Sequence, residues 1–247
     1  ATAGCVRRDK QEERTMTVRR LVPVVLSAML AASAVQATLY NDAVGDEAFG
    51  HPHLDIVSVE VMNDATDIMF TINLSGDPIA TDWGKYLVGI DSVVGGDGAG
   101  NGWGRPILMP SGMDYWVGSW VDWGDGAEVY NWSTSNTWDL VDGAYGADST
   151  DILLPVKSPT SVTLTTSLSS MGLGVGDTFI FDVFTSGGGG TDSAIDALSD
   201  PTTTVANWDD PYTSPTSLRY TVIPEPATLA LVLLGLGALW YRRRRGA

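Results

Sequence analysis

Hydrophobic and polar residues alternate along much of the chain. "LDIVSVEVM" (54–62) places its three valines on one face of an extended segment, and "DIMFTINL" (67–74) alternates in the same way. Seven further segments have the length and composition of strands: 85–91, 114–121, 127–132, 151–156, 161–168, 178–184 and 218–222. A single helical turn is expected at 168–173. The pattern predicts an all-β fold, an antiparallel β-sandwich of about nine strands.

Residues 16–37 contain the three parts of a secretory signal peptide. Two arginines precede a mostly apolar stretch, and small residues end it at Ala37, as a signal peptidase requires. We expect translation to start at Met16, cleavage after Ala37, and residues 1–15 to be an upstream translation artefact. A cytosolic amphipathic leader is the alternative, and the uncharged apolar stretch fits it less well.

The C-terminal segment, residues 223–247, joins a short apolar stretch to an arginine cluster. Residues 227–241 carry no charge, and as a helix they would span roughly 22 Å, less than the roughly 30 Å hydrocarbon core of a bilayer. The cluster consists of Arg242, Arg243, Arg244 and Arg245. Arginines stay on the cytoplasmic side of a membrane, so we expect a marginal transmembrane helix with residues 38–222 outside the cytoplasm.

Pro224, Glu225 and Pro226 precede this apolar stretch. The tripeptide, the apolar stretch and the arginine cluster, in this order, resemble the PEP-CTERM sorting signal of Gram-negative bacteria that make extracellular polysaccharide. The resemblance implies recognition by an exosortase, a membrane transpeptidase-like enzyme, and processing near the tripeptide. The protein would then cross the inner membrane, remain anchored there transiently, and reach the cell surface or extracellular matrix. An ordinary C-terminal anchor is the alternative.

The composition of residues 38–222 narrows the possible partners. This region holds 26 acidic and four basic residues, so the clustered cations that bind phosphates are missing and nucleic acid is not an expected partner. It also contains no cysteine, so its core and not disulfides must stabilise it. Its length suits one domain.

Several stretches of this domain resemble DOMON-like and family-9 carbohydrate-binding-module-like β-sandwiches. They are "DAVGDEAFGHPHLDIVSVEVMNDATDIMFTI", "LSSMGLGVGDTFIFDVFTSGG" and "DSAIDALSD". The resemblance implies a sandwich that binds sugar or haem, in some cases with calcium. Residues 76–150 follow no pattern of these families, so no ligand residues are carried over from them.

Six tryptophans fall within residues 103–138, among several aspartates. An indole packs against the apolar face of a sugar ring, while carboxylates and amides bind its hydroxyl groups. Trp116 and Trp120 share a face of a strand, and Trp123 lies on the turn beyond it, so these three are the expected platform for extracellular polysaccharide. The alternative is that the tryptophans form the core of a domain without disulfides.

A glycine-rich loop, "DSVVGGDGAGNGWG", carries Asp91, Asp97 and Asn101. Calcium binds oxygen atoms of short side chains and backbone carbonyls, which makes these three its candidate ligands. The spacing is not that of an EF-hand, and a flexible hairpin tip is the alternative.

His51 and His53 are the only histidines, and they lie on one face of an extended segment. They allow half of a metal site completed by Asp55, or a haem ligand paired with a methionine, and an ordinary lead-in to the following strand is the alternative. The candidate methionines are Met62, Met69, Met109 and Met113. A haem- or metal-binding DOMON-like module is therefore the alternative to a structural or polysaccharide-binding protein.

The sequence does not indicate an enzyme. No GxSxG nucleophile motif is present, and the sequence does not single out a carboxylate pair for a glycoside hydrolase, which is the last alternative.

Overall fold

The computed structural model describes residues 37–92, 100–224, 234, 235 and 237. Residues Gln36–Pro224 form one compact unit, and the terminal segments belong to another. Residues 16–36 of the expected signal peptide and most of the C-terminal sorting segment lie outside the described residues. No helix within the described part of the chain is both long and apolar enough to cross a membrane.

The first sheet has five antiparallel strands. Their order is β1 (Thr38–Asn41), β2 (Ile56–Asn63), β3 (Asp67–Leu74), β10 (Ser161–Ser167) and β9 (Val156–Ser158). The 3-10 turn η1 (Pro52–Leu54) precedes β2, and a second turn, η2 (Ser169–Met171), follows β10. The second turn confirms the helical turn expected at 168–173.

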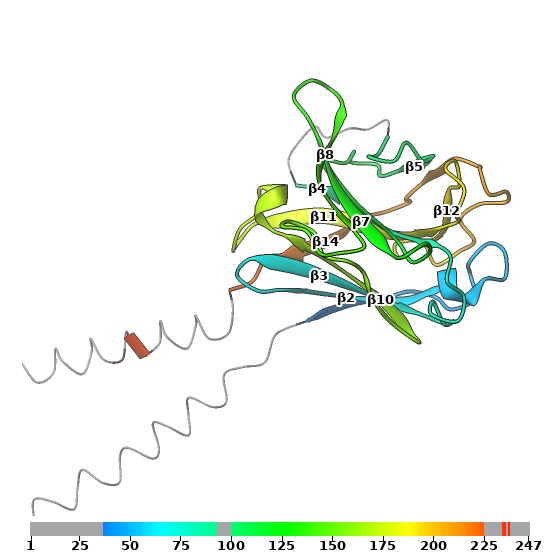
Figure 1. The fold of residues 1–247 in the computed structure, drawn as a ribbon, viewed down its shortest axis with the longest axis horizontal. Coiled ribbons are helices and arrows are strands. Elements are labelled where there is room, and N and C mark those ends of the chain that lie inside the picture. Colours follow the sequence, from blue (N-terminus) through cyan, green and yellow to red (C-terminus); the bar gives the residue numbers. More distant parts are fainter. Residues whose placement is uncertain (1–36, 93–99, 225–233, 236, 238–247) are drawn as a thin grey trace, which may run out of the picture. The chain divides into compact units, whose positions relative to one another are not determined.

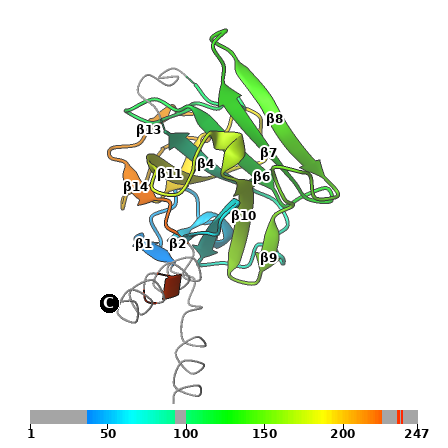
Figure 2. The same ribbon diagram turned by 90° about the vertical axis from the view of Figure 1, so that its left-hand side faces the viewer.

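The second sheet faces the first (Figure 1). Its antiparallel strands are β12 (Ala194–Ala197), β11 (Thr178–Ser186), β4 (Lys85–Asp91), β6 (Tyr115–Trp120), β7 (Gly126–Trp132) and β8 (Trp138–Tyr145), and β14 (Leu218–Thr221) also pairs with β11. A separate parallel pair joins β5 (Ile107–Leu108) to β13 (Tyr212–Thr213). Figure 2 shows β6, β7 and β8 side by side, with β8 at the outer edge.

The space between the two sheets is filled by alternate residues of their strands. Ile68, Phe70 and Ile72 of β3 are completely buried there, as their alternation predicts. In β2 the register shifts between Ile56 and Ser58, and this bulge makes Ile56, instead of Val57, the residue that enters the core.

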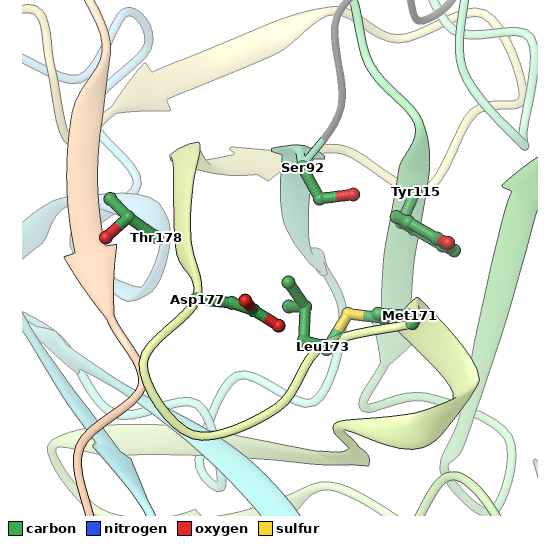
Figure 3. Close-up of a pocket in the computed structure, with 7 residues that line it drawn as sticks. Ser92, Tyr115, Met171, Leu173, Asp177 and Thr178 are labelled. Carbon is green, nitrogen blue, oxygen red and sulfur yellow. The ribbon is translucent and has the colours of Figure 1, made fainter.

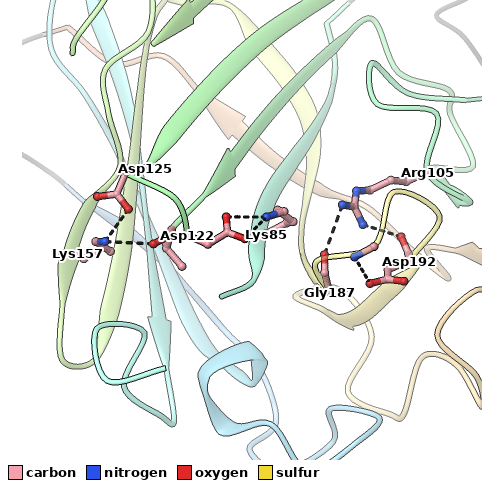
Figure 4. Close-up of polar contacts among 9 residues, drawn as sticks. Lys85, Arg105, Asp122, Asp125, Lys157, Gly187 and Asp192 are labelled. Carbon is pink, nitrogen blue, oxygen red and sulfur yellow. Dashed lines mark hydrogen bonds and ion pairs between the residues drawn. The ribbon is translucent and has the colours of Figure 1, made fainter. Parts of the chain in front are cut away.

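A second core lies on the other face of the second sheet. It contains Leu87 of β4 and Phe184 of β11, and it is covered by the β5 and β13 pair through Ile107 and Tyr212. Arg105 fixes this cover, because its guanidinium donates a hydrogen bond to Ser186 Oγ at 2.7 Å. It also donates to the carbonyl oxygens of Asp192 and Gly187 at 2.9 and 3.4 Å (Figure 4). The domain is thus two sheets with a loop layer over one of them.

The expected all-β, antiparallel architecture is confirmed, and the expected number of strands is wrong. The described residues contain 14 strands, of which the parallel β5 and β13 are the exception to the antiparallel pattern. The segment predicted as a strand at 151–156 forms only one bridge, between Ile152 and Thr166, before β9 begins at its end. The strands that the sequence pattern missed are β1, β5, β8, β9, β12 and β13.

Candidate functional site

Aromatic rings lie flat on the outer face of β6, β7 and β8. The rings can approach the backbone this closely at Gly118, Gly126 and Gly143, because glycine has no side chain to occupy the space above the sheet. A Cβ atom at Gly126 would lie 1.9 Å from Trp120, and one at Gly118 would lie 2.5 Å from Trp103. A Cβ atom at Gly143 would likewise lie 2.5 Å from the Tyr145 ring. Three rings therefore pack directly against the backbone of the sheet.

These rings are neighbours. The centroid of Trp120 lies 6.1 Å from that of Trp103 and 5.9 Å from that of Tyr145, at interplanar angles of 46° and 37°. The strand register explains the arrangement, since Trp120 pairs with Gly126, and Gly126 pairs in turn with Tyr145. Trp103 and Trp120 are half-buried, and Tyr145 is 58% exposed. Part of each ring stays accessible to a ligand.

Glu128 of β7 orients three of the aromatic side chains. Its carboxylate accepts hydrogen bonds from Trp103 Nε1 at 2.7 Å, from the Tyr130 hydroxyl at 3.0 Å and from the Tyr145 hydroxyl. Burial, reinforced by the Glu128 charge, raises the pKa of Tyr130 to about 12, so this phenol keeps its proton and donates at neutral pH. We name the set Trp103, Trp120, Tyr130 and Tyr145, arranged around Glu128, the aromatic face.

Trp103 lies in the loop before β5, and hydrogen bonds from Asn101 stabilise the conformation of that loop. The Asn101 amide donates hydrogen bonds to the carbonyl oxygens of Arg105 and Ile107 at 2.8 and 3.0 Å. Its Oδ1 accepts the backbone N–H groups of Trp103 and Arg105 at 3.1 and 3.2 Å. The Arg105 guanidinium also lies 5.6 Å from the Trp103 ring centroid, which allows a cation–π contact. These contacts fix the position of Trp103 at the aromatic face.

The turn between β6 and β7 presents Trp123 to solvent. Its side chain is 99% exposed, and its φ of +54° is in the left-handed region, as is the φ of +62° at Asp125. Such backbone costs about 1 kcal/mol or more per non-glycine residue and persists only where its surroundings hold it. Two ion pairs hold this turn, Lys85 with Asp122 at 2.9 Å and Lys157 with Asp125 at 2.6 Å (Figure 4).

The structure separates the three tryptophans that the sequence groups together. Trp120 belongs to the aromatic face, and Trp123 stands alone on the turn. Trp116 shares a face with Trp120 but is 0% exposed, because it lies in the second core against Phe184 and Trp103. Trp116 therefore has no surface free to stack on a sugar, and the expectation that it contributes to an exposed platform is corrected.

The three candidate calcium ligands have different surroundings. Asn101 is buried, and both ends of its amide are already engaged within its own loop. Asp97 lies outside the described residues. Asp91, at the end of β4, is half-buried, and desolvation raises the pKa of its carboxyl. In the described part of the chain, Asn101 thus acts as a loop-shaping residue and offers no free oxygen to a cation.

His51 and His53 lie within an aromatic cluster. The His53 ring is buried with its centroid 4.4 Å from that of Trp83, and the His51 centroid lies 5.0 Å from Trp83 and 5.6 Å from Trp208. Burial lowers the pKa of His53, so its imidazole is neutral at neutral pH. Among the described residues, neither histidine is part of a group of three acidic, cysteine or histidine side chains close enough to bind a metal ion.

A pocket of about 360 Å³ opens at the other end of β6 (Figure 3). Its lining consists of Ser92, Tyr115, Met171, Gly172, Leu173, Asp177 and Thr178. Asp177 is the one carboxylate in this lining, and its Oδ2 accepts the N–H of Gly174 at 2.8 Å. The lining of the pocket therefore lacks the pair of carboxylates that glycoside hydrolysis needs.

Comparison with known proteins identifies the C-terminal segment. Residues 222–245 match the PEP-CTERM protein-sorting motif, which marks proteins exported through the membrane to the cell surface. The match includes Pro224, Glu225, Pro226 and the arginine cluster, and it implies processing by an exosortase. The chain is thus an exported protein with an exosortase sorting signal. No curated protein matches the chain.

Proposed function

We propose that the exported domain binds extracellular polysaccharide through the aromatic face and Trp123. The observation that carries this proposal is the row of rings laid flat over Gly118, Gly126 and Gly143. A flat, partly exposed ring offers its face to the C–H surface of a pyranose, and Glu128 fixes three of the rings before any ligand arrives.

The position of Trp123 supports the same function. Exposing a whole indole forfeits the stabilisation of roughly 25 cal/mol per Å² that burial would give it, and the left-handed backbone adds a further cost. Two ion pairs stabilise this turn. The exposed indole contributes little to the stability of the fold, but its face is accessible to a ligand. A sorting signal that delivers the protein to the cell surface brings both features to the place where polysaccharide is found.

The alternatives gain less support. A haem- or metal-binding module would use His51 or His53, whose rings are packed against Trp83. A glycoside hydrolase needs two carboxylates on either side of a bound sugar, whereas Glu128 at the aromatic face accepts three hydrogen bonds from neighbouring side chains. A purely structural matrix protein remains the outcome if no glycan binds.

Trp123→Ala and Tyr145→Ala should each weaken glycan binding by roughly tenfold or more, because truncating an aromatic residue that makes a main binding contact commonly costs about 2 kcal/mol. Trp123→Ala should change the free energy of unfolding by no more than about 0.5 kcal/mol, since its side chain is exposed. Binding is measured as retardation in gels that contain the exopolysaccharide of the producing organism, and stability by thermal denaturation.

Val156→Ala is the matched control, because Val156 is 66% exposed on β9 of the first sheet. It should be retarded as strongly as the wild type. A wild-type protein that migrates equally with and without each polysaccharide would refute glycan binding. Normal retardation of both aromatic variants would show that binding occurs elsewhere on the domain.

A further inference from the structure

Three carboxylates from separate parts of the chain converge at one edge of the sandwich. Asp46 lies in the loop after β1, Asp55 between η1 and β2, and Asp196 in β12. One oxygen of each lies within 4.8 Å of an oxygen of the other two. Asp55 is 3% exposed and Asp196 is 0% exposed. The group therefore joins the first sheet to the second beneath the surface.

Backbone and hydroxyl donors fix two of these carboxylates. Asp55 accepts the N–H of Gly45 at 3.0 Å and the Ser75 hydroxyl at 2.6 Å. Asp196 accepts the N–H of Ile56 at 2.6 Å and that of Ala197 at 2.8 Å. These bonds hold the carboxylates in place, and each comes from a neutral donor. The two Lys–Asp ion pairs found among the described residues lie at the β6–β7 turn.

Asp46 is different, because the residue is half-buried and its carboxylate has no hydrogen-bond partner in another residue. Both of its oxygens are buried, and neither receives a hydrogen bond from another residue. The same holds for Oδ2 of the nearby Asp42, whose Oδ1 accepts only the N–H of Ala43. Natural proteins rarely bury an unpaired carboxylate, since an uncompensated buried charge is strongly destabilising. Three buried oxygens thus point to a cation that the chain itself does not supply.

We propose that Asp46, Asp55 and Asp196, with Asp42 beside them, bind one calcium ion. Oxygen donors alone, several of them charged, are the ligands of a hard divalent cation, and loop residues such as Asp42 and Asp46 can adjust to the irregular coordination that calcium accepts. The bound ion would cross-link the loop after β1 to β12, and so stabilise a domain that has no cysteine to form disulfide bonds.

The electrostatics of the group agree with this proposal. Without a cation, burial and then the neighbouring carboxylates raise the pKa of Asp42 and of Asp196 to about 8. Asp46, Asp55 and Asp196 place oxygen atoms of like charge within 4.8 Å of one another, and a divalent cation bound between them would offset their repulsion. The site shares no residue with Asp91, Asp97 and Asn101, where the sequence predicts calcium.

Asp46→Asn is the variant that tests the site. Its carboxylate accepts no hydrogen bond from another residue, so an amide of the same shape should preserve the fold while removing a ligand charge. Asp209→Asn is the matched control, because Asp209 is exposed and the substitution removes the same charge. The full chain is purified in detergent, stripped with a chelator, and dialysed to equilibrium against radioactive calcium.

We expect the wild type and Asp209→Asn to bind one calcium ion per chain saturably, and Asp46→Asn to bind it at least tenfold more weakly. At the same calcium concentration, the melting temperature should rise more for the first two proteins than for Asp46→Asn, because the stabilisation grows with the ratio of the calcium concentration to Kd. The proposal fails if the wild type binds no calcium saturably or if Asp46→Asn binds it as the wild type does. It also fails if sodium chloride of equal ionic strength raises the melting temperature equally.

Discussion

Trp116→Ala is expected to destabilise the domain by about 3–5 kcal/mol, a large part of the 5–15 kcal/mol typical of a folded domain. The Trp116 side chain is completely buried in the second core, with its ring centroid 6.4 Å from that of Phe184 and 6.4 Å from that of Trp103. Truncation leaves a cavity beneath Trp103, so the proposed glycan binding should weaken as a consequence of lost packing.

Urea denaturation followed by circular dichroism measures this effect, and Trp123→Ala is its control. Both variants lose one indole, and Trp123→Ala should change the free energy of unfolding by less than about 0.5 kcal/mol. If the two variants lost equal stability, the assignment of Trp116 to the core and of Trp123 to the surface would be wrong.

Asp182 is expected to make stability depend on pH between about 4 and 7. The Asp182 carboxylate is completely buried in β11. It connects two loops to this strand, since it accepts hydrogen bonds from the Ser199 hydroxyl at 2.6 Å and from the Ser214 hydroxyl at 2.5 Å. The N–H of Val183 adds a third bond at 2.9 Å. Burial outweighs these bonds and raises the pKa of Asp182 from its ordinary value of 3.8 to about 6.

The sign of this effect follows from proton linkage. The native state holds the Asp182 proton more tightly than the unfolded state, so the stabilisation is complete below about pH 4 and is lost as the pH rises through 6. A shift from 3.8 to about 6 corresponds to about 3 kcal/mol.

The difference in unfolding free energy between the wild type and Asp182→Asn isolates this group, because the amide does not titrate. Between pH 4 and 7 the wild type should lose about 2 kcal/mol of stability relative to Asp182→Asn. The same comparison with the exposed control Asp209→Asn should be nearly flat. A difference for Asp182→Asn that is constant with pH would show that its pKa is not raised.

The sequence predicts the central strands because their environment repeats every two residues. In β3, Ile68, Phe70 and Ile72 alternate with polar residues since one face meets the core and the other does not. β12 was missed because its four residues are all buried, so no alternation appears. In β8, an extra residue separates the two residues that pair with Val129 and Tyr130. This register shift breaks the alternation of the strand.

The candidate site depends on contacts that no local pattern contains. Trp116 and Trp120 occupy equivalent alternate positions, and of the two only Trp116 is fully buried, because it packs in the second core against Phe184 and Trp103. Glycines at alternate strand positions were the available signal, because they mark where rings pack against the sheet. The carboxylates of Asp46 and Asp196 meet only through the packing of two sheets, so their spacing in the chain carries no information.

The C-terminal segment is the reverse case, since a short local motif suffices to identify it. Residues 222–245 match the PEP-CTERM sorting motif, although most of them lie outside the described structure. Glu225→Ala removes the one carboxylate of the tripeptide. We expect this variant to retain the arginine cluster and to remain with the membrane fraction.

The intact mass of the wild-type protein recovered from the cell surface tests the central claim, that this chain is an exosortase-processed exported protein. The account predicts a mass that lacks residues 1–37 and the cluster Arg242, Arg243, Arg244 and Arg245. A surface protein whose mass still includes these four arginines would contradict it.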